Sequence, residues 1–118
     1  MVLPKEGEDA HIRGFIMSKL YHMKCWVKPH GNPRRHHSLT NIKKGYPKHH
    51  RGSKFDKNLS RLAKERLIYI FPHGTEHHCC AILDHEAIHQ GIQIANQYRL
   101  AEGIPAWGNE FEELLKSL

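Results

Sequence analysis

Apolar side chains recur at helical spacing in the first half of the chain. Between residues 10 and 26 they fall where one face of a helix would turn toward a core, at Ile12, Phe15, Ile16, Leu20, Met23 and Trp26. A loop follows at 27–37, marked by two Pro, one Gly and one Asn. Ser38 is then expected to cap a short helix over 39–45, which Gly45 and Pro47 would end.

A third helix is predicted over residues 53–66, and its two sides differ in chemistry. One side is apolar, with Phe55, Leu59, Leu62 and Ala63, continued by Leu67. The opposite side is polar at spacings of i, i+3, i+4 and i+7, with Lys54, Lys57, Asn58 and Arg61. The pattern predicts a helix anchored on one side and exposed on the other.

Two strands and a further helix are predicted after residue 66. Residues 67–72 and 79–83 are rich in β-branched, aromatic and small apolar side chains, and the segment 73–78 between them contains Gly74. They indicate a β-hairpin. Asp84 is expected to cap a helix at about 85–101, which Gly103 and Pro105 would end.

This order of elements predicts a mostly α protein with a small β-hairpin, of the α+β class. A chain of 118 residues is a normal size for one domain with its own core, so residues 1–118 are expected to form a single domain. Residues 84–118 would add a C-terminal helix and tail to a core formed by 10–83. Their apolar side chains either form a homodimer contact or complete the core of a monomer.

Positive charge is concentrated in the middle of the chain. The net charge is +6, but residues 24–66 hold 13 of the 18 Lys and Arg and only two acids, giving that segment +11 and the remainder −5. This separation predicts an anionic partner for the middle segment. The alternative is a basic protein without a specific partner. Five of the twelve His also lie in this segment, so its charge is expected to rise as pH falls through the ordinary His range.

The stretch SLTNIKKGYPKHHRGSKFDKNLSRLAKERLIYIFP, residues 38–72, resembles small stand-alone winged helix-turn-helix proteins of archaeal type. The resemblance covers about residues 10–100 and includes the seam from Leu62 to Leu67 and Ile68 that leads into the wing. It implies double-stranded DNA binding and transcriptional regulation. The turn before the third helix is longer than in the simplest members, and the wing tip, PHGTEHH, has Glu76 and no Lys or Arg.

An α-helix fits the major groove of B-DNA, and the resemblance makes helix 53–66 the one that would enter it. The side chains expected to contact bases are Lys54, Lys57, Asn58 and Arg61. Those expected to contact phosphates are Lys43, Lys44, Lys48, Arg51, Arg34 and Arg35. An ordinary solvated helix surface is the alternative for the first four.

A second interpretation is an RNA- or ribosome-associated basic module. Readers of single-stranded RNA usually present exposed aromatic side chains on which bases stack. In the basic segment only Tyr46 is expected to be exposed, because Phe55 and Trp26 are expected in the core. This favours duplex DNA over RNA.

The segment HHCCAILDHEAIH, residues 77–89, suggests a zinc site as a further alternative. Its candidate ligands are Cys79, Cys80, His85 and His89, with His77 or His78 as an alternative fourth. The spacing matches no standard zinc finger. The competing interpretation is a buried strand with two small Cys followed by surface His, in which case no cofactor is needed.

No catalytic motif is present, and the protein is not expected to be an enzyme. The alternative is a nucleophile formed by Cys25 with His22, since both are expected on the first helix. The odd number of Cys favours reduced thiols, and no apolar run approaches the roughly 18 residues of a membrane helix. Without a signal-like N-terminal segment, the expected location is cytoplasmic and nucleoid-associated.

Overall fold

The computed structural model describes residues 2–118. In chain order the elements are α1 (Asp9–His22), β1 (Trp26–Val27), β2 (His37–Ser38), α2 (Leu39–Lys44), the 3-10 helix η1 (Lys48–His50), α3 (Ser53–Lys64), β3 (Ile68–His73), β4 (Glu76–Ile82), α4 (His85–Ala101) and α5 (Glu112–Lys116). The protein therefore has the predicted α+β class, with a small mixed sheet in place of a hairpin alone.

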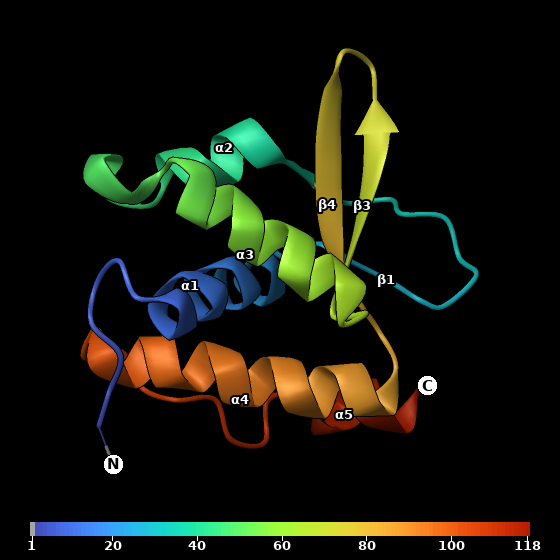
Figure 1. Cartoon of the computed structure of the whole chain (residues 1–118). Helices are drawn as coiled ribbons and strands as arrows, with labels where there is room; N and C mark the ends of the chain where they lie inside the picture. The colour runs from blue at the N-terminus through green and yellow to red at the C-terminus, as the bar shows by residue number, and fades with distance from the viewer. Residues whose placement is uncertain (1) are drawn as a thin grey trace.

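Helix α1 lies between α3 and α4 in a layered arrangement (Figure 1). The β3–β4 hairpin extends from one end of these stacked helices. One core cluster joins these parts. It includes Ile12, Ile16 and Leu20 of α1, Phe55, Leu59 and Leu62 of α3, Cys79 and Ala81 of β4, Ala87 and Ala95 of α4, and Phe111. The segment 84–118 thus contributes to the same core as the preceding residues.

Strand β4 is the centre of the sheet. Strand β3 pairs with one edge of it in antiparallel register, with Tyr69 opposite Cys80. The other edge is shared by two short strands: β1 runs parallel beside Ala81 and Ile82, and β2 runs antiparallel beside His78 and Cys79. The loop 28–36 is consequently held at both ends by the same strand.

Helices α1 and α4 pack closely because each has a glycine at the contact. A methyl group on Gly14 would lie 2.4 Å from Tyr98 Cβ and 2.8 Å from the carbonyl oxygen of Ile94. One on Gly91 would lie 2.0 Å from Tyr21 Oη. Distances this short are incompatible with a side chain, so the glycines permit the two helices to approach. None of the helices in residues 2–118 is long and apolar enough to cross a bilayer.

Several predicted helix ends are confirmed. Ser38 Oγ accepts a hydrogen bond from Asn41 N at 3.1 Å, and Asp84 Oδ1 accepts one from Ala87 N at 2.8 Å, as N-cap residues do. Gly103, with φ of 72°, follows the end of α4. Gly45 follows the last residue of α2 as its C-cap, with a right-handed φ of −78°.

The first helix ends earlier than predicted. Helix α1 stops at His22, Lys24 adopts a φ of 56° that turns the chain away, and Trp26 begins β1. The reason is the open edge of β4, where Ala81 N donates to the carbonyl oxygen of Cys25 at 2.8 Å and Leu83 N donates to that of Val27 at 2.7 Å. Sheet pairing therefore replaces the last turn of the predicted helix.

The third helix and the hairpin match the predicted positions with shifted ends. Helix α3 covers 53–64 instead of 53–66. The strands cover 68–73 and 76–82, so the turn is confined to Gly74 and Thr75. The His-rich segment assigned to the turn instead extends both strands.

Candidate nucleic-acid interface

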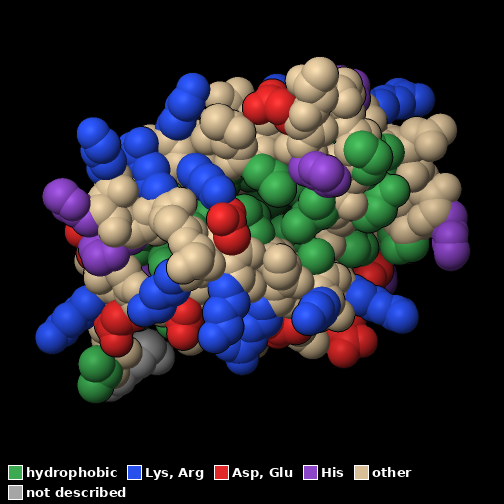
Figure 2. Space-filling model, turned by 45° about the horizontal axis from the view of Figure 1, so that its top comes forward, with side chains coloured by type: hydrophobic (Ala, Val, Ile, Leu, Met, Phe, Trp, Pro, Cys, Tyr) green, Lys and Arg blue, Asp and Glu red, His purple; other side chains and the backbone are tan. Residues whose placement is uncertain are grey.

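Helix α3 exposes a row of cations opposite its buried side. Phe55, Leu59 and Leu62 are buried in the core, and this orients the helix. Four cations are exposed on the other side: Lys54, Lys57, Arg61 and Lys64, here called the α3 basic face. Lys64 lies three residues after Arg61 and continues the row beyond the residues predicted from the sequence. Lys and Arg side chains gather over α2 and α3 at the left and centre of Figure 2.

Asn58 does not belong to this exposed face, and its prediction as a base-contacting residue is wrong. Its exposed fraction is 1%. The side-chain amide donates to Asp9 Oδ1 and to the carbonyl oxygen of Lys54, each at 2.9 Å. Both amide hydrogens are therefore used inside the protein. Position 58 lies at the boundary between the polar and apolar sides of the helix, and α1 covers that boundary.

The predicted phosphate-contacting residues near α3 have different surroundings. Lys44 and Lys48 are exposed. Lys43 forms an ion pair with Asp56. The Arg51 guanidinium donates to the carbonyl oxygens of Tyr46 at 2.6 Å and Lys44 at 2.8 Å, which holds the turn between α2 and α3 together. Lys44 and Lys48 thus present their charge to solvent more fully than Lys43 and Arg51 do.

Both acids within residues 24–66 are paired with cations. Asp56 is paired with Lys43. Glu65 accepts two hydrogen bonds from Arg13 Nη2, at 2.8 and 2.9 Å, and lies 3.5 Å from Arg61 Nε. Pairing reduces the opposing negative field beside the α3 basic face. Lys54, Lys57 and Lys64 form no ion pair within residues 2–118.

Arg34 and Arg35 lie apart from this surface. Both are exposed on the loop 28–36, which projects from the opposite side of the hairpin from α2 and α3 (Figure 1). They line a pocket with residues of β1 and α5. The structure therefore does not bring them together with the α3 basic face.

The candidate zinc ligands are not brought together. Cys79 and Cys80 are buried in β4, whereas His85 and His89 are exposed on α4. Burial raises the pKa of the Cys80 thiol to about 12 and also raises that of Cys79, which disfavours the thiolate that zinc binds. In the described chain, residues 2–118, no group of three His, Cys, Asp or Glu is arranged to hold a metal ion.

The Cys25–His22 pair is also not formed on one helix, contrary to the expectation. Helix α1 ends at His22, and Cys25 is buried beyond it with Sγ 3.8 Å from the carbonyl oxygen of Met23. Burial raises the pKa of the Cys25 thiol, which is the opposite of what a reactive nucleophile needs.

A cluster of three imidazoles was not foreseen from the sequence. His36, His73 and His78 have ring centroids 4.5 to 4.8 Å apart, and the Nδ1 atoms of His36 and His78 are 2.8 Å apart. Burial, reinforced by His73 and His78, lowers the pKa of His36. Burial also lowers the pKa of His37, with a contribution from Lys19. These two His therefore become charged at a lower pH than an ordinary His would.

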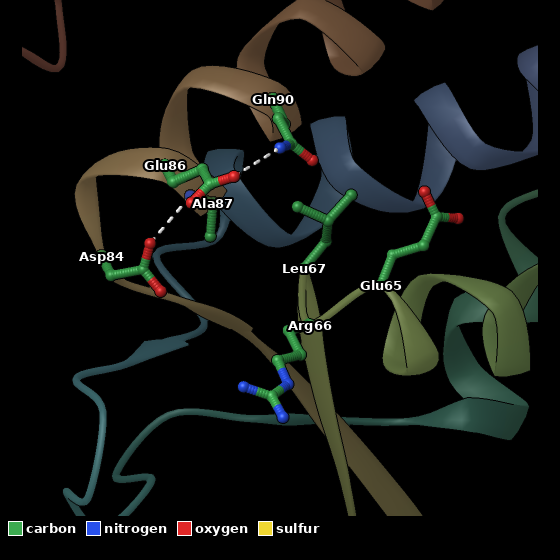
Figure 3. A pocket seen from close by; sticks show the side chains of 7 residues that line it. All are labelled: Glu65, Arg66, Leu67, Asp84, Glu86, Ala87 and Gln90. Carbon is green, nitrogen blue, oxygen red and sulfur yellow. Dashed lines mark hydrogen bonds between the residues drawn. The ribbon is translucent and has the colours of Figure 1, made fainter.

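A small polar pocket of about 230 Å³ lies where α3 ends and α4 begins (Figure 3). Its three carboxylates already have partners: Glu65 binds Arg13, Asp84 caps α4, and Glu86 accepts from Gln90 Nε2 at 3.3 Å. Glu65 thus connects the end of α3 to α1, Asp84 caps α4, and Glu86 has its contact within α4.

Aromatic exposure differs from the prediction. Tyr46, expected to be exposed, is 1% exposed and packs against Phe15 and Phe55. Its hydroxyl accepts from Gly7 N at 2.8 Å and lies 2.6 Å from His11 Nδ1. Tyr69 is instead 46% exposed on β3, stacked on Phe71 with 5.3 Å between ring centroids.

Comparison of the chain with family models, with curated proteins and with solved structures found no match in any of the three. Functional inference therefore depends on the geometry of the chain itself.

Proposed function

We propose that this protein binds double-stranded DNA in a sequence-specific manner and regulates transcription, with α3 inserted in the major groove. The observation that carries the proposal is the α3 basic face. Four exposed cations lie on a helix whose other side is fully buried. Such a helix can present its side chains to base edges without losing its own packing.

The order of elements supports a winged helix-turn-helix arrangement. Helices α1, α2 and α3 are followed directly by the β3–β4 hairpin, which would act as the wing. The exposed Lys44 and Lys48 precede α3 and suit contacts with phosphates on either side of a groove. The wing tip offers His73, Glu76 and His77 to solvent, so its attraction to phosphate would be weak near neutral pH.

Selection of bound sequences from a random DNA pool tests sequence-specific binding. Enrichment of a common motif is expected. On that motif, Arg61→Ala should weaken binding by about 1 to 3 kcal/mol and relax one base preference. Lys116→Ala, which removes an exposed cation on α5, is the matched control and should bind like the parent protein. A pool without any enriched motif would contradict the proposal.

One observation favours the RNA-associated alternative. The exposed Tyr69, stacked on Phe71, provides an aromatic surface of the kind on which single-stranded bases stack. Competition between duplex DNA and structured or single-stranded RNA, at a stated salt concentration, distinguishes the two functions. Under the DNA proposal, Tyr69→Ala leaves binding unchanged; under the RNA alternative it weakens binding by about 1 to 3 kcal/mol per stacked base.

We include homodimerisation in the proposal, because regulators of this kind commonly bind two-fold operators. Most of the small and apolar side chains of α4 pack on α1, but Leu100 near its end and Ile104, three residues beyond it, are 45% and 37% exposed. These two side chains are the candidates for the contact. Light scattering measures the molar mass of the parent protein and of Leu100→Glu. A dimeric parent and a monomeric variant are expected, and a monomeric parent would contradict homodimerisation.

A further inference from the structure

The loop 28–36 and the strand before it line a solvent-open pocket that duplex binding by α3 does not use. Its volume is about 680 Å³, which is within the range of small-molecule sites. We name it the loop pocket. It is lined by four cations and by an apolar group, together with Gly31 and Asn32: Lys24, Lys28, Arg34, Arg35, Trp26, Val27, Leu83 and Leu114.

The charged lining of the loop pocket is entirely positive. None of its lining residues is acidic, and within residues 2–118 none of its four cations forms an ion pair. Four like charges around one cavity repel one another, and an anion placed between them relieves that repulsion. The surface around α3 differs, because two acids lie among its cations: Glu65 is paired with Arg13 and Asp56 with Lys43.

The apolar lining restricts the kind of anion. Val27 and Leu83 are buried, whereas Trp26 is half-buried and contacts Phe111 edge to face, with 6.5 Å between ring centroids. A bare phosphate would leave these apolar side chains without a contact. A flat ring can stack on an indole while an attached phosphate is bound by the cations.

We propose that the loop pocket binds a small organic anion that joins at least two negative charges to a flat apolar body, with a nucleoside diphosphate as the chemical class. The position of the pocket argues against a duplex as the occupant. It lies on the loop side of the hairpin, away from α3, and it is a concave site rather than an extended track. This inference does not depend on DNA binding by α3.

Calorimetric titration of the full chain with ADP tests the site. Saturable binding with a dissociation constant below about 1 mM is expected. The double variant Arg34→Ser, Arg35→Ser should weaken it at least about tenfold, because two charge-assisted contacts are lost. The matched control is Lys54→Ser, Lys57→Ser, which removes two exposed cations from α3 and should leave ADP binding unchanged. All four substituted side chains are exposed, so the variants are expected to fold, and thermal melting verifies this.

Two further measurements test the role of Trp26 and the position of bound ADP. Trp26→Leu should weaken ADP about tenfold while changing pyrophosphate binding little. Saturating ADP should slow tryptic cleavage after Arg34 and Arg35 but leave cleavage after Lys48 unchanged. Absence of saturable ADP binding, equal weakening in the two double variants, or pyrophosphate binding as tight as that of ADP would each overturn the proposal.

Discussion

The amide of Asn58 and the carboxylate of Asp9 join α3 to the first turn of α1 through a hydrogen bond of 2.9 Å. The same amide donates to the carbonyl oxygen of Lys54 one turn earlier. Asn58 is therefore a structural residue within a helix whose neighbouring Lys and Arg are exposed. The hydrogen bond from Asn58, followed by smaller effects of Lys54, Lys57 and Arg61, lowers the pKa of Asp9 despite an opposing effect of burial.

Asn58→Ala is expected to reduce stability rather than change base preference. Two hydrogen bonds from a buried amide are lost, so the free energy of unfolding should fall by about 1 to 2 kcal/mol. Urea denaturation measures this. Once folded, the variant should select the same DNA sequences as the parent. A changed base preference would show that Asn58 contributes to base recognition.

Lys57→Ala should act on binding and leave stability unchanged. The side chain is exposed and forms no ion pair within residues 2–118. As a base contact, Lys57 would favour particular sequences, and its loss should relax one base preference on the selected motif. Titrations at several salt concentrations, on the motif and on an unrelated duplex, measure this. A slope of log affinity against log salt reduced by about 1, with no change in base preference, would make Lys57 a phosphate contact instead.

The imidazole cluster predicts a loss of stability in mild acid. The pKa of His36 is lowered by burial and by His73 and His78, so the folded state binds fewer protons than the unfolded state between that pKa and the ordinary value of about 6.5. The free energy of unfolding should therefore be highest above pH 6.5 and decrease as pH falls below it. His36→Gln should flatten this dependence, measured by urea denaturation from pH 7.5 to 5.0. His85→Gln, on an exposed part of α4, is the control and should retain the parent profile.

Gly91→Ala should disrupt the contact between α1 and α4. The added methyl group would lie 2.0 Å from Tyr21 Oη and 3.0 Å from Met17 Cε, so these two buried side chains would have to shift within the contact. A loss of about 1 to 3 kcal/mol is expected, with a lower melting temperature. Gly108→Ala is the matched control, because the nearest atom to its added Cβ is Glu110 Oε2 at 3.9 Å. Equal melting temperatures for the two variants would contradict the close packing.

The sequence predicted the elements whose signals are local. Ser38 and Asp84 have the side chains that cap helices, and the apolar residues of α3 recur at helical spacing, so α2, α3 and α4 were found with ends correct to within two residues. The hairpin was found because β-branched and aromatic side chains surround Gly74.

Features that depend on distant partners were missed. Strands β1 and β2 have two residues each, and they are strands only because the edge of β4 provides hydrogen-bond partners. Polarity alone also misplaced Asn58 and Tyr46, since their hydrogen bonds to Asp9 and Gly7 cross 49 and 39 positions of sequence. The same limit applies to the cluster of His36, His73 and His78, which joins three separate segments.

The pairing of β1 and β2 with one strand has a consequence for engineering. Val27 and His37 are each held beside β4, opposite Ile82 and Cys79, so the two ends of the loop 28–36 are fixed by backbone hydrogen bonds. A loop whose ends are fixed in this way can change in length with little thermodynamic penalty, because the closure entropy grows slowly with added residues. The fold should therefore tolerate a peptide tag or a second small domain inserted between Val27 and His37, whereas such an insertion would change the loop pocket.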